Sequence, residues 1–215
     1  MNKRLEHTMR SYVKIFCIGI LIGCLCRLLD YFPADTIWSF SSIQTLLGFW
    51  IMTNTIIVLL SSSNICAGIS SFLYMFGMTL GFYGLQAILG IFIPLFSGGF
   101  RTSLFVLFTV LSIPCGAAAF ILYGWNQNNT FNSILYSLPV GALIAETIAI
   151  SVYFSIYHSF LFQLLMNSVG IIAFGILFFK RANCKAIYAI SVILSTLLFY
   201  FAFALYHREV SMWLF

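Results

Sequence analysis

The residue with the clearest chemical potential is Glu146, in the sequence LIAETIAI. It is the one charged side chain in the apolar run from Ile134 to Phe154, and the nearest Lys or Arg residues in the chain are Arg101 and Lys180. A charge at the centre of a bilayer costs at least about 2.5–3.5 kcal/mol on insertion scales. Glu146 is therefore expected to have a partner, or to carry a proton.

Two interpretations of Glu146 remain open at the level of sequence. As a functional group, it would anchor a substrate amine, relay protons or bind an ion, because ionisable residues inside membranes usually serve such roles. As a structural group, it would be a buried latch between helices. Ala142 and Ala149 share its helix face. A face of small residues packs against other helices rather than lipid, so the carboxylate is predicted to point into the bundle.

Three arrangements could satisfy this carboxylate. Arg27 lies near the outer end of the first apolar run, roughly 6 Å from Glu146 in depth if each residue rises about 1.5 Å. The rival partner for Arg27 is Asp30, one turn along the same helix. The third arrangement is a protonated Glu146 that is hydrogen-bonded to Asn167 or Gln163, because burial favours the neutral form of a carboxyl group.

The composition identifies the environment in which this chemistry would occur. The chain has 215 residues, of which 62% are hydrophobic and 7% are charged. A soluble domain carries about 25% charged residues, so this chain has too few to cover a water-exposed surface. A separate soluble domain is excluded as well, because apolar runs long enough to cross a bilayer recur along the whole length. We predict one integral membrane domain over residues 1–215.

The apolar runs predict an all-α, polytopic transmembrane helical bundle of about seven spans. Helices are favoured over a β-barrel because the runs are continuously apolar and do not alternate. The predicted spans are Tyr12–Leu29, Ile43–Leu60, Ile65–Leu85, Leu104–Tyr123, Ser133–Phe154, Ser159–Phe179 and Ala186–Tyr206. LIGC at Leu21–Cys24 is similar to a lipoprotein cleavage box, but we interpret it as part of the first span.

Basic residues predict the orientation. They cluster before the first span and between the sixth and seventh spans: Lys3, Arg4, Arg10, Lys14, Lys180, Arg181 and Lys185. Such clusters mark cytoplasmic ends. With an odd number of spans, the N-terminus is therefore predicted to be cytoplasmic and the C-terminus to be outside.

The apolar sequence around the third span is longer than a bilayer requires. It runs from Ile65 to Phe96 with several glycines and a proline. We expect the helix to break near Gly84–Gly90 and an interfacial or re-entrant piece to follow within residues 84–97. Gly77 and Gly81 form a GxxxG spacing, which favours close approach of another helix.

Three further polar features can be interpreted either structurally or functionally. Asn54 lies in the second span, where it could line a hydrophilic path. The SSSN sequence that ends at Asn64 is a good N-cap for the third span. The RLLDYFPADTIW segment from Arg27 to Trp38 is typical of an interface turn, since Tyr and Trp favour the headgroup level. The functional interpretation of that segment is an outward-facing charged site.

Catalytic chemistry and bound metal are not indicated by the sequence. The six cysteines form no CxxC pair, and the histidines do not have the spacing of a helix-borne metal pair. The motifs of phosphate-binding loops, hydrolase elbows and intramembrane proteases are missing too. We therefore predict no enzyme activity, no catalytic residues, no metal and no cofactor.

Part of the chain resembles a known group of proteins. RLLDYFP, DTIW, GFW at Gly48–Trp50, SSSN and MFGMTLGFYG, together within about residues 27–84, resemble small uncharacterised multi-spanning membrane proteins of Gram-positive bacteria that are filed under a domain of unknown function. The resemblance implies a bacterial plasma-membrane setting and no particular activity.

Two classes of function are compatible with these features. The first is a transporter or permease-like small-molecule-binding protein of the bacterial inner membrane, with a buried carboxylate in its polar interior. Its candidate ligand-binding or proton-relay residues are Glu146, Arg27, Asp30, Asn54, Asn167 and Gln163. The second is a non-transporting subunit that assists assembly, immunity or regulation of a larger membrane complex. The expected partners are the lipid bilayer, a small-molecule or ion ligand, and a membrane protein or second copy, but no nucleic acid.

Overall fold

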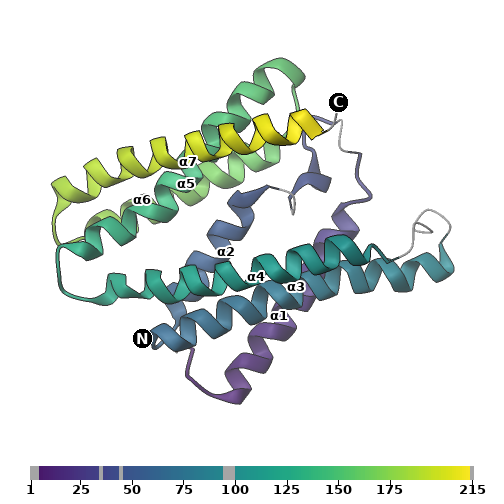
Figure 1. Cartoon of the computed structure of the whole chain (residues 1–215), viewed down its shortest axis with the longest axis horizontal. Coiled ribbons are helices and arrows are strands. Elements are labelled where there is room, and N and C mark those ends of the chain that lie inside the picture. The colour runs from purple at the N-terminus through teal and green to yellow at the C-terminus, as the bar shows by residue number, and fades with distance from the viewer. Residues whose placement is uncertain (1–4, 34–35, 44–45, 94–99, 214–215) are drawn as a thin grey trace. The chain divides into compact units, whose positions relative to one another are not determined.

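The structure is a computed structural model, which describes residues 5–33, 36–43, 46–93 and 100–213, with side chains placed up to residue 205 in the last range. Within these ranges the chain is helical (Figure 1). The α-helices are α1 (Met9–Leu29), α2 (Leu47–Leu60), α3 (Asn64–Phe92), α4 (Thr102–Leu122), α5 (Phe131–Tyr157), α6 (Leu161–Arg181) and α7 (Lys185–Trp213). Two short 3-10 helices, η1 (Phe40–Ser42) and η3 (Tyr123–Asn126), lie between them.

The predicted class, an all-α membrane bundle, is confirmed. Six of the described helices are long and apolar enough to cross a bilayer. The exception is α2, which has 14 residues and is therefore about 21 Å long at a rise of 1.5 Å per residue. The hydrocarbon core is about 30 Å thick, so α2 alone does not span it.

The end of α2 lies beside the start of the chain's first helix. Leu5 N–H donates to the carbonyl of Leu60 at 2.6 Å, and Ser62 N–H donates to the carbonyl of Leu5 at 3.0 Å. Leu5 precedes α1 by only a few residues, so α2 returns the chain to the side from which α1 departed. The span predicted at Ile43–Leu60 corresponds to a shorter helix that begins at Leu47 and is not among the six helices long enough to cross a bilayer.

The chain divides into two compact units. Unit 1 comprises residues 1–33 and 53–123, and unit 2 comprises residues 34–52 and 124–215. In unit 1, α3 contacts both α1 and α4; in unit 2, α5 contacts both α6 and α7. Residues of α2 belong to both units, since the division falls between Met52 and Thr53.

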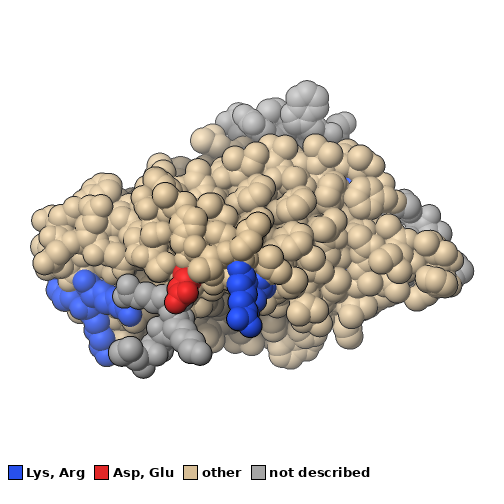
Figure 2. Space-filling view, turned by 90° about the horizontal axis from the view of Figure 1, so that it is seen from below, with Lys and Arg blue, Asp and Glu red and all other residues tan. Residues whose placement is uncertain are grey.

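The central helix of each unit is more buried than its neighbours. More than half of the apolar window of α3 and of α5 is buried, whereas less than a fifth of that of α4 and of α7 is buried. The central helices carry many Gly, Ala and Ser residues, which allow close packing. Figure 2 shows a surface that is largely free of charged side chains, as expected for helices that face lipid.

Two glycine pairs bring α1 and α3 into backbone contact. The predicted close approach at Gly77 and Gly81 is confirmed, because a Cβ atom at either would lie closer than 3.0 Å to a backbone oxygen of α1. On α1, Gly19 and Gly23 have the same spacing, and Cβ atoms there would lie equally close to backbone oxygens of α3. The two GxxxG motifs therefore face each other, as such motifs do in tightly packed membrane helices.

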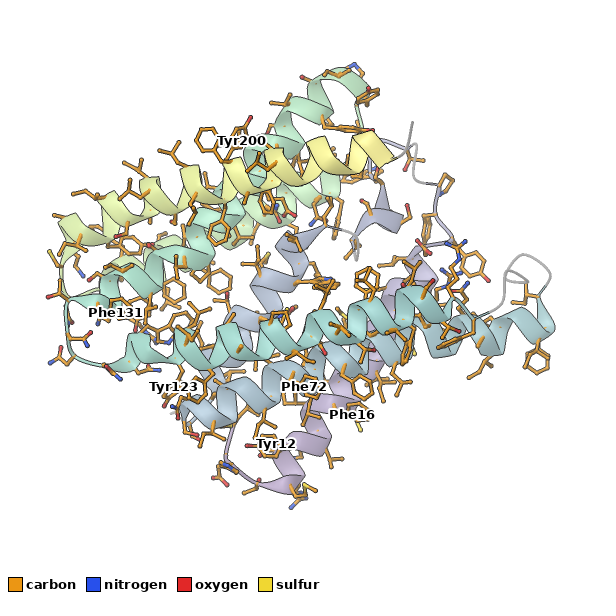
Figure 3. All side chains as sticks on the ribbon, in the orientation of Figure 1. Tyr12, Phe16, Phe72, Tyr123, Phe131 and Tyr200 are labelled. Atoms are coloured by element: carbon orange, nitrogen blue, oxygen red, sulfur yellow. The ribbon has the colours of Figure 1, made fainter. Side chains whose placement is uncertain are left out.

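Aromatic rings extend this contact along the same helices. Phe16 of α1 stacks on Phe76 of α3 at a centroid distance of 5.9 Å, and Phe76 stacks on Phe72 at 6.1 Å. Phe16 and Phe72 are labelled in Figure 3. Such ring pairs contribute about 0.5–1.5 kcal/mol each beyond the area they bury, so they reinforce the glycine contact.

The prediction that this helix breaks near Gly84–Gly90 is wrong. Helix α3 runs without interruption from Asn64 to Phe92. Glycine costs a helix about 1 kcal/mol relative to alanine, but it keeps its backbone N–H. In a bilayer, an unpaired N–H costs several kcal/mol, so the helical hydrogen bonds prevail. Residues 87–92 of the proposed re-entrant piece are thus helical, and residues 94–99 lie outside the described residues.

A lysine closes the end of α6. Lys185 Nζ donates to the carbonyl oxygens of Lys180 at 3.0 Å and Ala182 at 2.8 Å, and also to that of Phe179. The last carbonyl groups of a helix have no partners within it. A cation at this end also interacts favourably with the helix dipole, so Lys185 stabilises the end of α6 both by its hydrogen bonds and by its charge.

Replacing Lys185 with methionine is expected to lower the free energy of unfolding by about 1 kcal/mol, the usual magnitude for a cation at a helix C-terminus. The measurement is thermal unfolding of the purified protein in detergent. Lys180→Met is the matched control, because Lys180 is exposed and lies in the same turn. Equal midpoints for the two variants would show that the cap contributes nothing.

Candidate functional site: a buried carboxylate at the start of a short helix

Glu146 lies inside unit 2, as predicted from the small residues on its helix face. Its side chain is 5% exposed. It projects from α5 towards α6 and the first turn of α2, and residues of both helices contact its carboxylate. Glu146 precedes the end of α5 at Tyr157 by eleven residues, or about 16 Å along the helix axis, so it lies near the middle of a helix that is long and apolar enough to cross a bilayer.

The carboxylate accepts hydrogen bonds from two sources. Asn167 Nδ2 of α6 donates to Glu146 Oε2 at 2.8 Å. The backbone N–H groups of Leu47 and Gly48, at the start of α2, also donate to the carboxylate. The N–H groups of a first helical turn have no partner within their own helix, and this end of a helix favours negative charge. Glu146 thus caps a helix that is distant in sequence.

Two buried amide side chains of α6 have hydrogen-bonding capacity that the described residues do not use. Gln163 is 1% exposed and Asn167 is 0% exposed. Among the described residues, both amide atoms of Gln163 and the Oδ1 atom of Asn167 have no hydrogen-bond partner. The two residues are four apart and therefore share one face of α6. A buried polar atom without a partner costs about 1–3 kcal/mol. We refer to Glu146, Gln163, Asn167 and the start of α2 as the cluster.

Because Gly48 has no side chain, the polar atoms of Glu146 and Asn167 can lie next to its backbone. A Cβ atom at this position would lie closer than 3.0 Å to both Asn167 Oδ1 and Glu146 Oε2. Any other residue type would push these oxygen atoms apart. The absence of a side chain at Gly48 therefore lets the start of α2 approach the polar atoms of α5 and α6.

We expect Gly48→Ala to lower the free energy of unfolding by about 1–3 kcal/mol, the usual cost of an added methyl group in a packed interior. The reason is that the methyl group displaces Glu146 and Asn167 from each other. Gly84→Ala is the matched control, because nothing lies within 4 Å of a Cβ atom there; it should be neutral or slightly stabilising. Thermal unfolding of both variants in detergent provides the comparison, and equal midpoints would contradict the crowding.

Arg27 belongs to unit 1 and pairs with Asp30, which was the rival partner considered from the sequence. Arg27 Nη1 lies 2.5 Å from Asp30 Oδ2, and the guanidinium lies 5.2 Å from the ring centroid of Phe82. Partial burial raises the pKa of the Asp30 carboxyl above its ordinary value, and Arg27 opposes that rise. Glu146 lies in the other unit and is held there by Asn167, so Arg27 and Glu146 each have a partner of their own.

Asn54 links helices within unit 1. Its Oδ1 atom accepts a hydrogen bond from Ser71 of α3, and its Nδ2 atom lies 3.2 Å from Met75 Sδ. Ser71 Oγ also lies 3.3 Å from the carbonyl oxygen of Cys115 in α4. These contacts give Asn54 the geometry of an interhelical latch between α2 and α3.

The predicted cap and turn are both present. Ser63 Oγ accepts a hydrogen bond from the backbone N–H of Cys66, so SSSN caps α3 as expected. In the RLLDYFPADTIW segment, the carbonyl of Ile37 accepts from Leu161 N–H at 2.9 Å, which attaches this turn to the start of α6. Asp35 lies outside the described residues.

The start of α2 is the part of the site that sequence reasoning missed. Gln163, Asn167 and Glu146 were candidates because they are polar residues in apolar runs. The helix N-terminus that meets them is made of backbone groups, which have no signature in residue type. Gly48 was the only signal available, and one glycine in a glycine-rich chain is not specific.

Glu146 and the groups that donate to it form a hydrogen-bonded polar cluster. Among the described residues, no group of three His, Cys, Asp or Glu side chains could hold a metal ion. The contacts around Glu146 come from neutral amides and backbone N–H groups, so no nucleophile and base are paired there.

No family model matches the chain, and no similar protein was found among curated sequences or solved structures.

Proposed function

We propose that this multi-pass membrane protein is a permease-like transporter that binds a small solute or ion at Glu146, Asn167, Gln163 and the start of α2. The observation that carries the proposal is that the buried amide atoms of Gln163 and the Oδ1 atom of Asn167 have no hydrogen-bond partner among the described residues, while Asn167 also contacts the buried carboxylate of Glu146. A purely structural latch would be stabilised by apolar replacements at Gln163. A binding site, in contrast, keeps free donors and acceptors for its ligand.

The position of α2 supports this proposal. Its first backbone N–H groups meet Glu146, whose depth is about 16 Å from the end of α5. A helix that begins at membrane depth exposes backbone groups, which are tolerated only where protein or a water-filled cavity surrounds them. Discontinuous helices of this kind form the substrate and ion sites of many secondary transporters.

The alternative function is a non-transporting membrane subunit in which Glu146 is a latch. The hydrogen bonds from Asn167 and the start of α2 favour it, because they hold three helices together. Gln163 does not fit this alternative, because its two buried amide atoms have no partner among the described residues. We therefore place the transporter first.

The proposal includes a setting and an orientation. We propose the bacterial plasma membrane, with the N-terminus cytoplasmic and the C-terminus outside. Basic residues at the start of α1 and in the α6–α7 turn support this orientation under the positive-inside rule. The ligand would then reach the site from the outer side through the shorter path, since Asn167 is six residues from the start of α6, or about 9 Å.

Access of water to the site separates the two functions. We expect Asn167→Cys to react with a membrane-impermeant methanethiosulfonate reagent in intact cells or in inside-out vesicles, because a transporter must open this buried position to water. The control is Val169→Cys, which lies on the lipid-exposed side of the same helix. It should stay unlabelled, since a thiolate does not form in hydrocarbon, and the parent chain measures labelling of the native cysteines.

A folded Asn167→Cys protein that reacts from neither side would contradict transport and favour the latch. Folding is checked by the thermal unfolding midpoint. Because Asn167 contacts Glu146 directly, Leu143→Cys provides a second buried reporter in α5, where the side chain is 0% exposed.

A further inference from the structure

The charge of the cluster is not balanced. The hydrogen bonds to Glu146 come from neutral groups, namely the Asn167 amide and two backbone N–H groups. Among the described residues, the ion pair is that of Arg27 and Asp30, in the other unit. The N-terminus of a helix carries about half an elementary positive charge. About half of the charge of an ionised Glu146 therefore remains uncompensated in a medium that strongly penalises it.

Two carbonyl oxygens on one face of α6 could bind a compensating cation. Asn167 Oδ1 and Gln163 Oε1 are carbonyl oxygens without donors. Asn167 Oδ1 and Glu146 Oε2 both lie within 3.0 Å of the position that a Cβ atom at Gly48 would take, so they are close to each other. Carboxylate and carbonyl oxygens replace the hydration shell of hard cations, and they accept hydrogen bonds from ammonium groups equally well.

The single carboxylate of the cluster favours a monovalent cation over a divalent one. The cluster contributes a single carboxylate, whereas protein sites for divalent calcium use six to eight oxygen ligands and commonly several carboxylates. A monovalent group would neutralise Glu146 without leaving an excess of positive charge near the start of α2. An anion is disfavoured because Glu146 already occupies the N–H groups that would bind it.

We propose that the cluster binds one monovalent cationic group, either an alkali-metal ion or a primary ammonium. Glu146 supplies the charge, and Gln163 and Asn167 supply carbonyl oxygens. The free Nε2 atom of Gln163 is left to donate to a water molecule or to an acceptor atom of a solute. This assignment rests on the proposed function, in which the same cluster is the transport site.

Ligand-dependent stability tests the assignment on the full-length protein in nanodiscs. Thermal unfolding is measured in sodium, lithium, potassium and methylammonium chloride, each compared with choline chloride at equal ionic strength. A ligand that binds only the folded state raises the midpoint in a saturable manner. We expect a saturable rise of several degrees with at least one of the probe cations. A response to alkali ions alone identifies an ion site, and a response to methylammonium alone identifies an amine site.

The variants connect the response to the cluster. Glu146→Gln and Gln163→Leu are each expected to reduce the saturable rise by at least half. Glu6→Gln is the matched control, because Glu6 is an exposed carboxylate before α1, and it should keep the full response. Two variants are used so that a folding defect in one does not leave the question open.

No saturable rise with any probe in the parent chain would overturn the assignment, as would a full rise in both cluster variants. The outcome is distinguishable from the failure of transport. Labelling of Asn167→Cys without a cation response overturns the cation site alone. A cation response without labelling leaves a static cation site and overturns transport alone.

Discussion

Substituting leucine for Gly23 is expected to separate α1 from α3 and to lower the free energy of unfolding by about 3 kcal/mol or more, at the upper end of overpacking costs. The effect should be large because the new side chain would meet backbone rather than flexible atoms. A Cβ atom at Gly23 already lies within 3.0 Å of the carbonyl oxygen of Met78 and the backbone N of Phe82. Relief therefore requires α1 to move as a whole.

The measurement is the thermal unfolding midpoint in mild detergent, together with the yield of monodisperse protein. Gly84→Leu, on α3, is the matched control, because its Cβ would meet nothing within 4 Å. If Gly23→Leu and Gly84→Leu unfold at the same temperature, the facing GxxxG contact does not hold unit 1 together.

The second large effect concerns Glu146→Leu. Leucine is far better tolerated in a bilayer than a carboxylate on insertion scales, yet we expect this variant to be destabilised by about 3 kcal/mol. Removing one partner leaves the others buried and unsatisfied. Asn167 Nδ2 and the N–H groups of Leu47 and Gly48 would all lose their acceptor.

Glu146→Gln distinguishes this explanation from simple loss of charge. A glutamine oxygen still accepts from the start of α2, and its amide can donate to the unpartnered Oδ1 of Asn167. The glutamine variant should therefore unfold within a few degrees of the parent chain, well above Glu146→Leu. A leucine variant as stable as the parent would show that the carboxylate does not cap α2.

These two effects arise from opposite solutions to the same physical problem. Backbone polar groups in a bilayer must be satisfied internally. In unit 1, continuous helices satisfy them, and glycines let the helices approach until dispersion contacts hold them. In unit 2, the first N–H groups of α2 have no partner within their own helix, so the carboxylate of Glu146 on α5 satisfies those of Leu47 and Gly48. That requirement explains why a carboxylate occurs in an apolar helix.

The break near Gly84–Gly90 was the clearest failure of sequence reasoning. That prediction assumed that glycine behaves as it does in water, where an interrupted helix exposes its N–H groups to solvent. Inside a bilayer no such solvent is present, and α3 continues to Phe92. Helix α2 begins at Leu47, later than the predicted Ile43. No residue type near that point is a strong helix breaker.

The amino-acid sequence by itself determined that this is an all-helical membrane protein, and it determined roughly where each helix lies. It could do so because hydrophobic length is a local property, summed over about twenty neighbouring residues. It also indicated that Glu146 faces inward and that Gly77 and Gly81 form a close contact. Partner identity was decided only by the tertiary structure: Arg27 with Asp30, Gly23 with Met78, and Glu146 with Asn167 and the start of α2. A partner depends on how helices that are distant in sequence are brought together, and backbone N–H groups, which every residue except proline carries, leave no trace in residue type.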